Sequence, residues 1–116
     1  MIEVKERSRE LTKVEEYLMT QGTDIEVIKN VADGTSIPVK AWCIFIDHKE
    51  EEDVELLSIL DTGNKAYSSQ SKTFKRAFGD IANLMGEQES AIIEQSGTTN
   101  AGRPFVNCSL DTSKLQ

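Results

Sequence analysis

The chain has 116 residues, of which 38% are hydrophobic and 28% charged, and its formal net charge is −7 at pH 7. This length fits one domain with a modest core, so neither a disulfide nor a metal is needed to stabilise the fold. No apolar run is long enough to span a bilayer, and the N-terminus is charged from the outset, which is unlike a secretory signal. We therefore expect a cytoplasmic protein with no membrane partner.

Few residues are suited to metal binding or catalysis. The chain has two cysteines, Cys43 and Cys108, and one histidine, His48. A zinc site needs about four nitrogen or sulfur ligands, and no glycine-rich phosphate loop is present. His48 lies beside a run of acidic residues, where a surface histidine is the simplest interpretation. We expect two buried thiols, no metal, no cofactor and no enzymatic activity.

The first third of the chain is the least regular. Residues 1–10 are mostly charged and are expected to form a flexible arm. Residues 11–19 carry Leu11, Val14 and Leu18 at helical spacing, but they also fit an edge strand, so both alternatives stay open. Residues 25–28 form a short extended piece, and residues 32–35 predict a tight turn that contains Gly34.

The centre of the chain predicts three strands and one helix. Residues 35–48, rich in β-branched and aromatic side chains, give the strongest strand signal, followed by residues 54–60 and 65–68. Residues 71–86 predict a helix with Ser71 as its N-cap and Gly86 at its end. Its apolar stripe is formed by Phe74, Phe78, Ile81 and Met85.

Two further strands, residues 90–95 and 105–110, are joined by a loop of hairpin composition and followed by a polar tail at residues 111–116. Three strands, a helix and a closing hairpin is the order of an OB-fold. The prediction is a mainly β domain over residues 11–110, a five-stranded OB-fold-like barrel with one helix between strands 3 and 4.

The charges are segregated along the chain. Residues 50–61 hold six acids and no base, whereas residues 62–86 have a net charge of +3. Binding of single-stranded DNA needs aromatic faces on which bases stack, together with some local positive charge. On the central strand Ala41, Cys43 and Phe45 share one face, while Lys40 and Trp42 lie on the other. Tyr67, beside Lys65, is expected to be exposed.

Several short motifs, in order, resemble the single-stranded DNA-binding proteins of protein-primed Bacillus phages. They are residues 29–35, residues 61–73, and Gly97-Thr98-Thr99 with Gly102 and Phe105. The resemblance covers roughly residues 11–110 and implies an OB-fold-like protein that coats displaced single strands with little sequence preference. It also favours a strand for residues 12–20, and it places two of the family's stacking tyrosines at Phe45 and Tyr67.

The sequence thus predicts non-specific single-stranded DNA binding during phage or mobile-element DNA replication. The partners are single-stranded DNA and, as a further expectation, replication proteins, with the chain a monomer or weak homo-oligomer. The predicted DNA-binding residues are Phe45, Tyr67, Trp42, Lys40, Lys65, Lys72, Arg103 and Phe105. The alternative is an OB-fold protein-interaction module or acidic DNA mimic that acts on a replication or host protein through the strip at residues 50–61.

Overall fold

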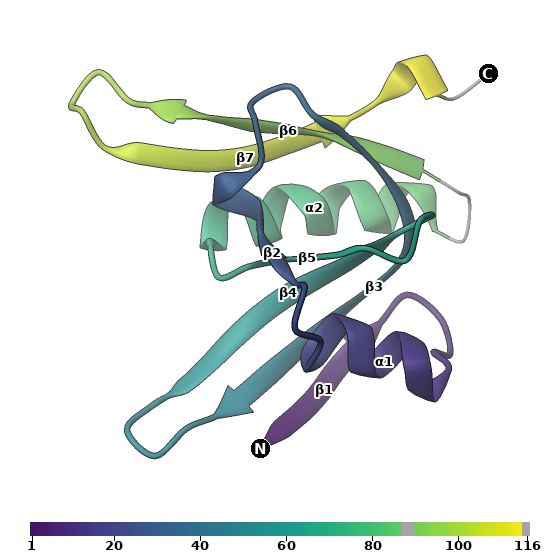
Figure 1. Ribbon diagram of the computed structural model, residues 1–116. Coiled ribbons are helices and arrows are strands. Elements are labelled where there is room, and N and C mark those ends of the chain that lie inside the picture. The colour runs from purple at the N-terminus through teal and green to yellow at the C-terminus, as the bar shows by residue number, and fades with distance from the viewer. Residues whose placement is uncertain (87–89, 115–116) are drawn as a thin grey trace.

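The computed structural model describes residues 1–86 and 90–114, and over these residues the chain is mainly β (Figure 1). Seven strands form one curled sheet that resembles half of a barrel, with two α-helices packed against it. The strands are β1 (Ile2–Arg7), β2 (Glu26–Val27), β3 (Ser36–His48), β4 (Asp53–Asp61), β5 (Ala66–Ser69), β6 (Ser90–Thr98) and β7 (Pro104–Leu110). The helices are α1 (Lys13–Thr20) and α2 (Lys72–Met85), with 3₁₀ turns η1 (Ile28–Asn30) and η2 (Thr112–Lys114).

The predicted count of five strands is wrong, because β1 and β2 also pair into the sheet. The five predicted strands correspond to β3, β4, β5, β6 and β7, and α2 lies between the third and the fourth of them as expected. Residues 2–7, expected to be part of a flexible arm, instead form β1 and pair antiparallel with β3. β2 pairs parallel with β5 and extends the sheet at that edge.

β3 organises the sheet because three strands pair with it. Along one edge it pairs antiparallel with β4 over nearly its whole length. Along the other edge its first residues, 36–39, pair with β6, and its later residues, 43–47, pair with β1. Within the described residues no strand pairs with positions 40–42 on that edge, so the sheet splits there and β6 and β1 diverge.

A register shift between Val39 and Ala41 accompanies this split. The extra residue offsets the alternation of side chains, as expected for a β-bulge. Ile37 lies in one apolar cluster with Trp42 packed against it, whereas Ala41, Cys43 and Phe45 lie in a second cluster. The predicted division of the central strand into an Ala41–Cys43–Phe45 face and a Trp42 face is confirmed.

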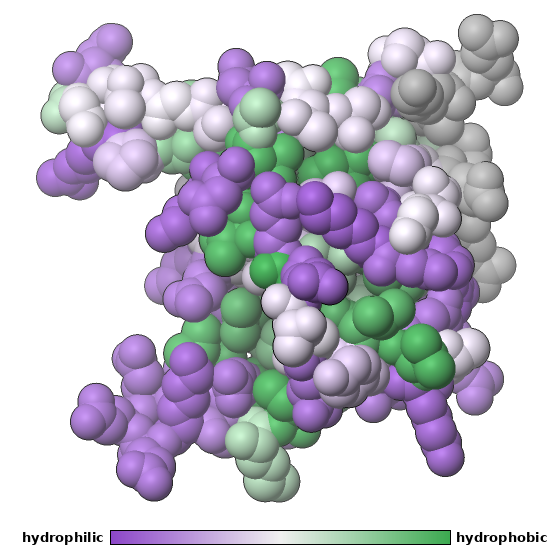
Figure 2. Space-filling view, in the orientation of Figure 1, coloured by the Kyte–Doolittle hydropathy of each residue, from purple (hydrophilic) through white to green (hydrophobic). Residues whose placement is uncertain are grey.

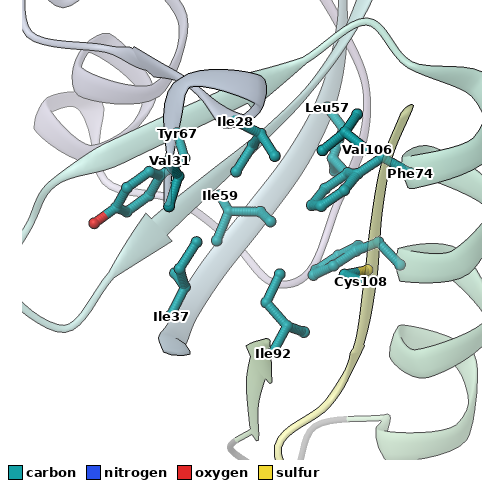
Figure 3. Close-up of a cluster of buried hydrophobic side chains, with 11 residues drawn as sticks. Ile28, Val31, Ile37, Leu57, Ile59, Tyr67, Phe74, Ile92, Val106 and Cys108 are labelled. Carbon is teal, nitrogen blue, oxygen red and sulfur yellow. The ribbon is translucent and has the colours of Figure 1, made fainter. Parts of the chain in front are cut away.

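The first core lies between α2 and the concave face of the sheet. Figure 1 shows α2 lying across the sheet, between the β6–β7 hairpin and strands β3 to β5. Phe74 points from α2 into the core, where it meets Leu57, Ile59 and Ile92 from the strands (Figure 3). Phe78, one turn further along α2, belongs to the same cluster. The amphipathic stripe read from the sequence is therefore the face that α2 buries. Ser71 caps the helix by accepting a hydrogen bond from the Phe74 N–H, and Gly86 ends it with φ of 60°.

The second core lies under α1, on the opposite face of β3 and β4. Met19 packs there with Cys43, Phe45 and Leu60. The helical alternative for residues 11–19 is the correct one, and the strand that the resemblance favoured is wrong. The reason is local: Thr12 and Glu15 form a capping box, which satisfies the first free N–H groups of a helix.

Both cysteines are buried and free, as predicted, and they lie in the two different cores. Burial raises the pKa of the Cys43 thiol to about 11 and that of Cys108 to about 12, so both stay protonated at neutral pH.

Neither helix in the described part of the chain is long and apolar enough to cross a membrane.

Candidate nucleic-acid interface

The two rings predicted to stack on bases are both buried. Phe45 is 3% exposed in the core under α1, and Tyr67 is 9% exposed in the core under α2. Figure 3 shows the Tyr67 ring among the core side chains, with its hydroxyl directed away from them. That hydroxyl donates a hydrogen bond to Asp61 Oδ2 at 3.2 Å. The expectation that Tyr67 is exposed is wrong, because β2 and η1 cover the strand that carries it.

Lys65 lies just before β5, and its charge is matched by an acid. Its Nζ is 2.5 Å from Glu26 Oε2 and 5.3 Å from the centre of the Tyr67 ring. The hydrogen bond to Glu26 raises the pKa of Lys65. A phosphate would have to compete with Glu26 for this cation, so Lys65 is a weaker candidate contact than the sequence suggested.

Of the aromatic residues predicted to bind DNA, Phe105 is the most exposed, with 42% of its surface accessible to solvent. It lies on the outer face of the β6–β7 hairpin, because its neighbours Val106 and Cys108 alternate into the core. Gly97 is its direct partner on β6, and a Cβ at Gly97 would lie 3.3 Å from the Phe105 ring. The ring therefore rests over the bare backbone of Gly97 and keeps its other side free.

The hairpin that carries Phe105 has no acid beyond Glu94, although exposed Asp33 accepts a hydrogen bond from the Ser96 N–H at 2.9 Å and so lies beside it. Residues 95–110 contain no Asp or Glu, and their one charge is Arg103 at the hairpin turn, which is exposed and forms no ion pair with any described residue. The outer face of the hairpin consists of uncharged side chains, namely Ile93, Gln95, Gly97, Phe105, Asn107 and Ser109. Figure 2 shows this hairpin as a pale, weakly polar strip.

Lys72 is the first residue of α2 and is fully available to solvent. Arg76 follows one turn later, and across the described residues neither side chain has an acidic partner. α2 packs against β7, and the N-terminal end of α2 lies on the same side of the molecule as the β6–β7 turn (Figure 1). Arg103 and Phe105 lie on the β6–β7 hairpin itself and form what we call the hairpin surface. Lys72 is set apart from Phe105, because α2 packs on the inner face of the hairpin and Phe105 lies on the outer face.

Lys40 and Trp42 lie elsewhere, at the split edge of β3. They line a cavity of about 360 Å³ together with the C-terminal half of α2. Trp42 is half-buried, and its ring meets Phe78 edge to face at a centroid distance of 5.9 Å. The structure thus divides the predicted site residues into four sets: the hairpin surface, Lys72 at the start of α2, the cavity, and the core rings with Lys65.

Arg9 also lines this cavity, and sequence reasoning missed it. Arg9 donates two hydrogen bonds to Glu15, at 2.8 and 3.0 Å, and Lys40 Nζ lies 3.6 Å from the same carboxylate. Nothing in the spacing of the sequence brings residue 9 to residue 40. The contact depends on the pairing of β1 with β3 and on the bulge at Val39, neither of which leaves a sequence signal.

The acidic run Glu50–Asp53 covers most of the turn between β3 and β4 and the first residue of β4, at the far end of that hairpin from the core. Its side chains are exposed, as expected for a solvated loop tip. His48 stands beside it between two acids, with Nε2 2.9 Å from Glu3 and Nδ1 2.9 Å from Asp53. The hydrogen bond to Glu3 makes the largest contribution to raising the pKa of His48, and the hydrogen bond to Asp53 raises it further.

The described residues include no group of three or more His, Cys, Asp or Glu side chains able to hold a metal ion. No protein-family model, curated protein or solved structure matches the chain, so the fold and the site are interpreted from their own geometry.

Proposed function

We propose that the protein binds single-stranded DNA without sequence preference and that the hairpin surface is where it does so. The observation that carries the proposal is the exposed Phe105 ring, which lies next to Gly97 on a hairpin face whose own side chains are uncharged. Each base that stacks on an aromatic ring contributes roughly 1–3 kcal/mol, whatever its identity. Arg103 at the hairpin turn supplies positive charge for phosphates.

The net charge of −7 opposes DNA binding, but the acids are unevenly distributed. The acidic tip of the β3–β4 hairpin and the β6–β7 hairpin project as separate arms (Figure 1). Exposed charges separated by more than about 10 Å are largely screened at 0.1 M salt. A strand on the outer face of β6–β7 would therefore meet Arg103 nearby and the acidic tip only at longer range, with Asp33 beside Ser96 as the one nearby acid among the described residues outside the hairpin.

Two further observations support the proposal. β3 pairs with both β4 and β6, and β6 with β7, so the five strands that the sequence predicted belong to one curled sheet, to which β1 and β2 are added. A curled sheet of this kind is consistent with the OB-type barrel that we propose. The resemblance to the single-stranded DNA-binding proteins of protein-primed Bacillus phages includes Gly97 and Phe105. We accordingly place the activity in phage or mobile-element DNA replication, where such proteins coat displaced strands.

The proposal is tested by measuring the fluorescence anisotropy of labelled oligo-dT at low salt. Phe105→Ala should weaken binding by roughly 1–3 kcal/mol, about tenfold for each 1.4 kcal/mol, because it removes a stacking face. The matched control is Tyr17→Ala, since Tyr17 is a similarly exposed ring, 52% accessible, on α1. Equal affinities for the two variants, or no binding by the unaltered protein, would contradict the proposal.

A second candidate is suggested by the exposed acids at the β3–β4 turn, which could bind a basic protein surface or imitate DNA. In that case the protein would retain a replication or host protein and would be indifferent to single-stranded DNA. Replacing Glu50, Glu51 and Glu52 with Gln would then abolish retention, whereas Phe105→Ala would leave it unchanged.

A further inference from the structure

The cavity at the split of β3 has a mainly apolar lining. Trp42 and Val39 come from β3, and Phe78, Ile81, Ala82 and Met85 from α2. Its volume of about 360 Å³ falls within the range of about 300–1,000 Å³ that is typical of small-molecule sites. The cavity exists because β6 and β1 diverge at Lys40–Trp42, which leaves no strand to cover this part of the edge.

The polar part of the lining is positively charged. Among residues 1–86 and 90–114, Arg9 and Lys40 are the charged residues that line the cavity and no acid does so, and both side chains remain partly exposed. Glu15 lies behind them and neutralises one of the two charges, so one positive charge remains for a ligand. On a protein with a net charge of −7, this is an unusual place to find surplus positive charge.

The indole N–H of Trp42 adds a directional group. Trp42 is half-buried beside the cavity, and its Nε1 makes no hydrogen bond to any part of the chain that the structure describes. A half-buried indole N–H usually finds an acceptor. A ligand that fits these features has a flat ring to lie against Trp42, acceptor atoms on that ring, and an anionic group for Arg9 and Lys40.

We propose that this cavity binds a single nucleotide, with the base against Trp42 and the phosphate near Lys40 and Arg9. The base supplies a flat face and acceptor atoms, and the phosphate supplies the negative charge. The cavity lies toward the C-terminal end of α2, whereas the hairpin surface lies at its N-terminal end, so this site is separate from the strand-binding surface.

Trp42 is the single tryptophan of the chain, so its fluorescence reports on the cavity directly. Titration with dTMP and dAMP should give a saturable change in emission, with thymidine bound at least fivefold more weakly and inorganic phosphate giving no change. Octanoate serves as an aliphatic anion without a flat ring. A response to octanoate and none to the nucleotides would overturn the proposal, as would equal affinities for thymidine and dTMP.

Two variants localise the binding. Lys40→Gln should weaken dTMP binding at least threefold, whereas Lys49→Gln, an exposed lysine in the β3–β4 turn, should leave it unchanged. Ala82→Leu places a larger side chain in the cavity and should abolish the heat of dTMP binding in titration calorimetry, with circular dichroism showing that the variant is folded. Undiminished dTMP binding by a folded Ala82→Leu would place the ligand elsewhere and overturn the proposal.

The oligo-dT assay separates this inference from the proposed function. If Ala82→Leu loses dTMP binding but keeps its affinity for oligo-dT, the cavity and the hairpin surface are two sites. Oligo-dT binding without any response to mononucleotides overturns the cavity proposal alone. Mononucleotide binding without oligo-dT binding overturns the hairpin proposal alone.

Discussion

The Tyr67 side chain stabilises the fold, and its burial determines what its substitution should do. The ring packs against Ile28 and Ile59, and the hydroxyl is bonded to Asp61. Tyr67→Phe removes only that hydrogen bond and should lower the free energy of unfolding by about 1 kcal/mol. Tyr67→Ala also leaves a cavity and should lower it by about 3–5 kcal/mol. Urea denaturation measures both, and an unchanged midpoint for Tyr67→Ala would show that the ring is not in the core.

Glu94 is a buried carboxyl group on β6 with little to compensate its charge. Its exposed fraction is 0%, Oε1 has no partner within the described structure, and Oε2 accepts a hydrogen bond from Ser96 Oγ at 3.4 Å. Burial raises the pKa of Glu94, and the nearby charge of Asp33 raises it further. Because the folded state holds this proton more tightly than the unfolded chain, its contribution to stability is complete below the ordinary pKa of a glutamate.

That contribution is lost as the pH rises through the ordinary value toward the raised pKa of the folded state. We therefore expect Glu94→Gln, which is neutral at every pH, to lose less stability than the unaltered protein between about pH 4 and pH 7. Denaturation at several pH values measures this slope. Glu10→Gln, at an exposed position before α1, is the control and should leave the slope unchanged. Parallel slopes for Glu94→Gln and the control would contradict the prediction.

At the scale of elements, α1 depends on Glu15, whose carboxylate links three other residues. Its carboxylate accepts two hydrogen bonds from Arg9 and one from the Thr12 N–H, and it lies near Lys40. These contacts, led by the hydrogen bond from Arg9, lower the pKa of Glu15 to about 2. The stabilisation is therefore present above the ordinary pKa and is lost as the pH falls toward about 2.

Glu15→Gln should accordingly lower the free energy of unfolding at pH 7 by about 1.5–3 kcal/mol, the contribution of hydrogen bonds to a charged group. The difference from the unaltered protein should shrink steadily below about pH 4, because the native carboxyl group becomes protonated there. Thermal denaturation at neutral and acidic pH compares the two proteins. A difference that persisted at the lowest pH would mean that α1 does not depend on the charge of Glu15.

The elements that local patterns define are the ones that the sequence predicted well. The Phe74–Phe78–Ile81 stripe and the Ser71 cap identified α2, and alternation identified β3. β1 was missed because its exposed charged residues, such as Glu3 and Lys5, hide the two residues that pack, Ile2 and Val4. Its place is determined by pairing with residues 43–47, a non-local contact that no local pattern reveals.

The candidate site was predicted less well for a similar reason. Aromatic and basic residues are the types that bind single-stranded DNA, but whether a given side chain is exposed depends on tertiary packing. Tyr67 and Phe105 each belong to a short strand with polar residues nearby, so the sequence does not distinguish them. In the structure β2 and η1 cover Tyr67, whereas no described residue covers the outer side of Phe105. Similarly, the bulge at Val39 turns Trp42 toward α2 and creates a cavity. These outcomes are set by how distant strands meet.

At the scale of the whole molecule, the electrostatic field decides how well an acidic protein can hold DNA. The longest principal extent is 38 Å, comparable with the Debye length of about 30 Å at 0.01 M salt. At that salt concentration the acids at the β3–β4 turn act on a strand bound anywhere on the surface. At about 0.1 M the Debye length falls to about 10 Å, so their influence on the hairpin surface becomes small.

Replacing Glu50, Glu51 and Glu52 with Gln changes the net charge from −7 to −4. We expect this variant to bind oligo-dT more tightly than the unaltered protein at about 0.01 M salt, and to lose that advantage by about 0.1 M, because the repulsion it removes is long-ranged. Replacing the same residues with Asp keeps the charge and is the matched control. If the Gln variant bound equally tightly at all salt concentrations, the acids would be too remote to matter. If it bound more weakly, DNA would be contacting the acidic turn rather than the hairpin surface.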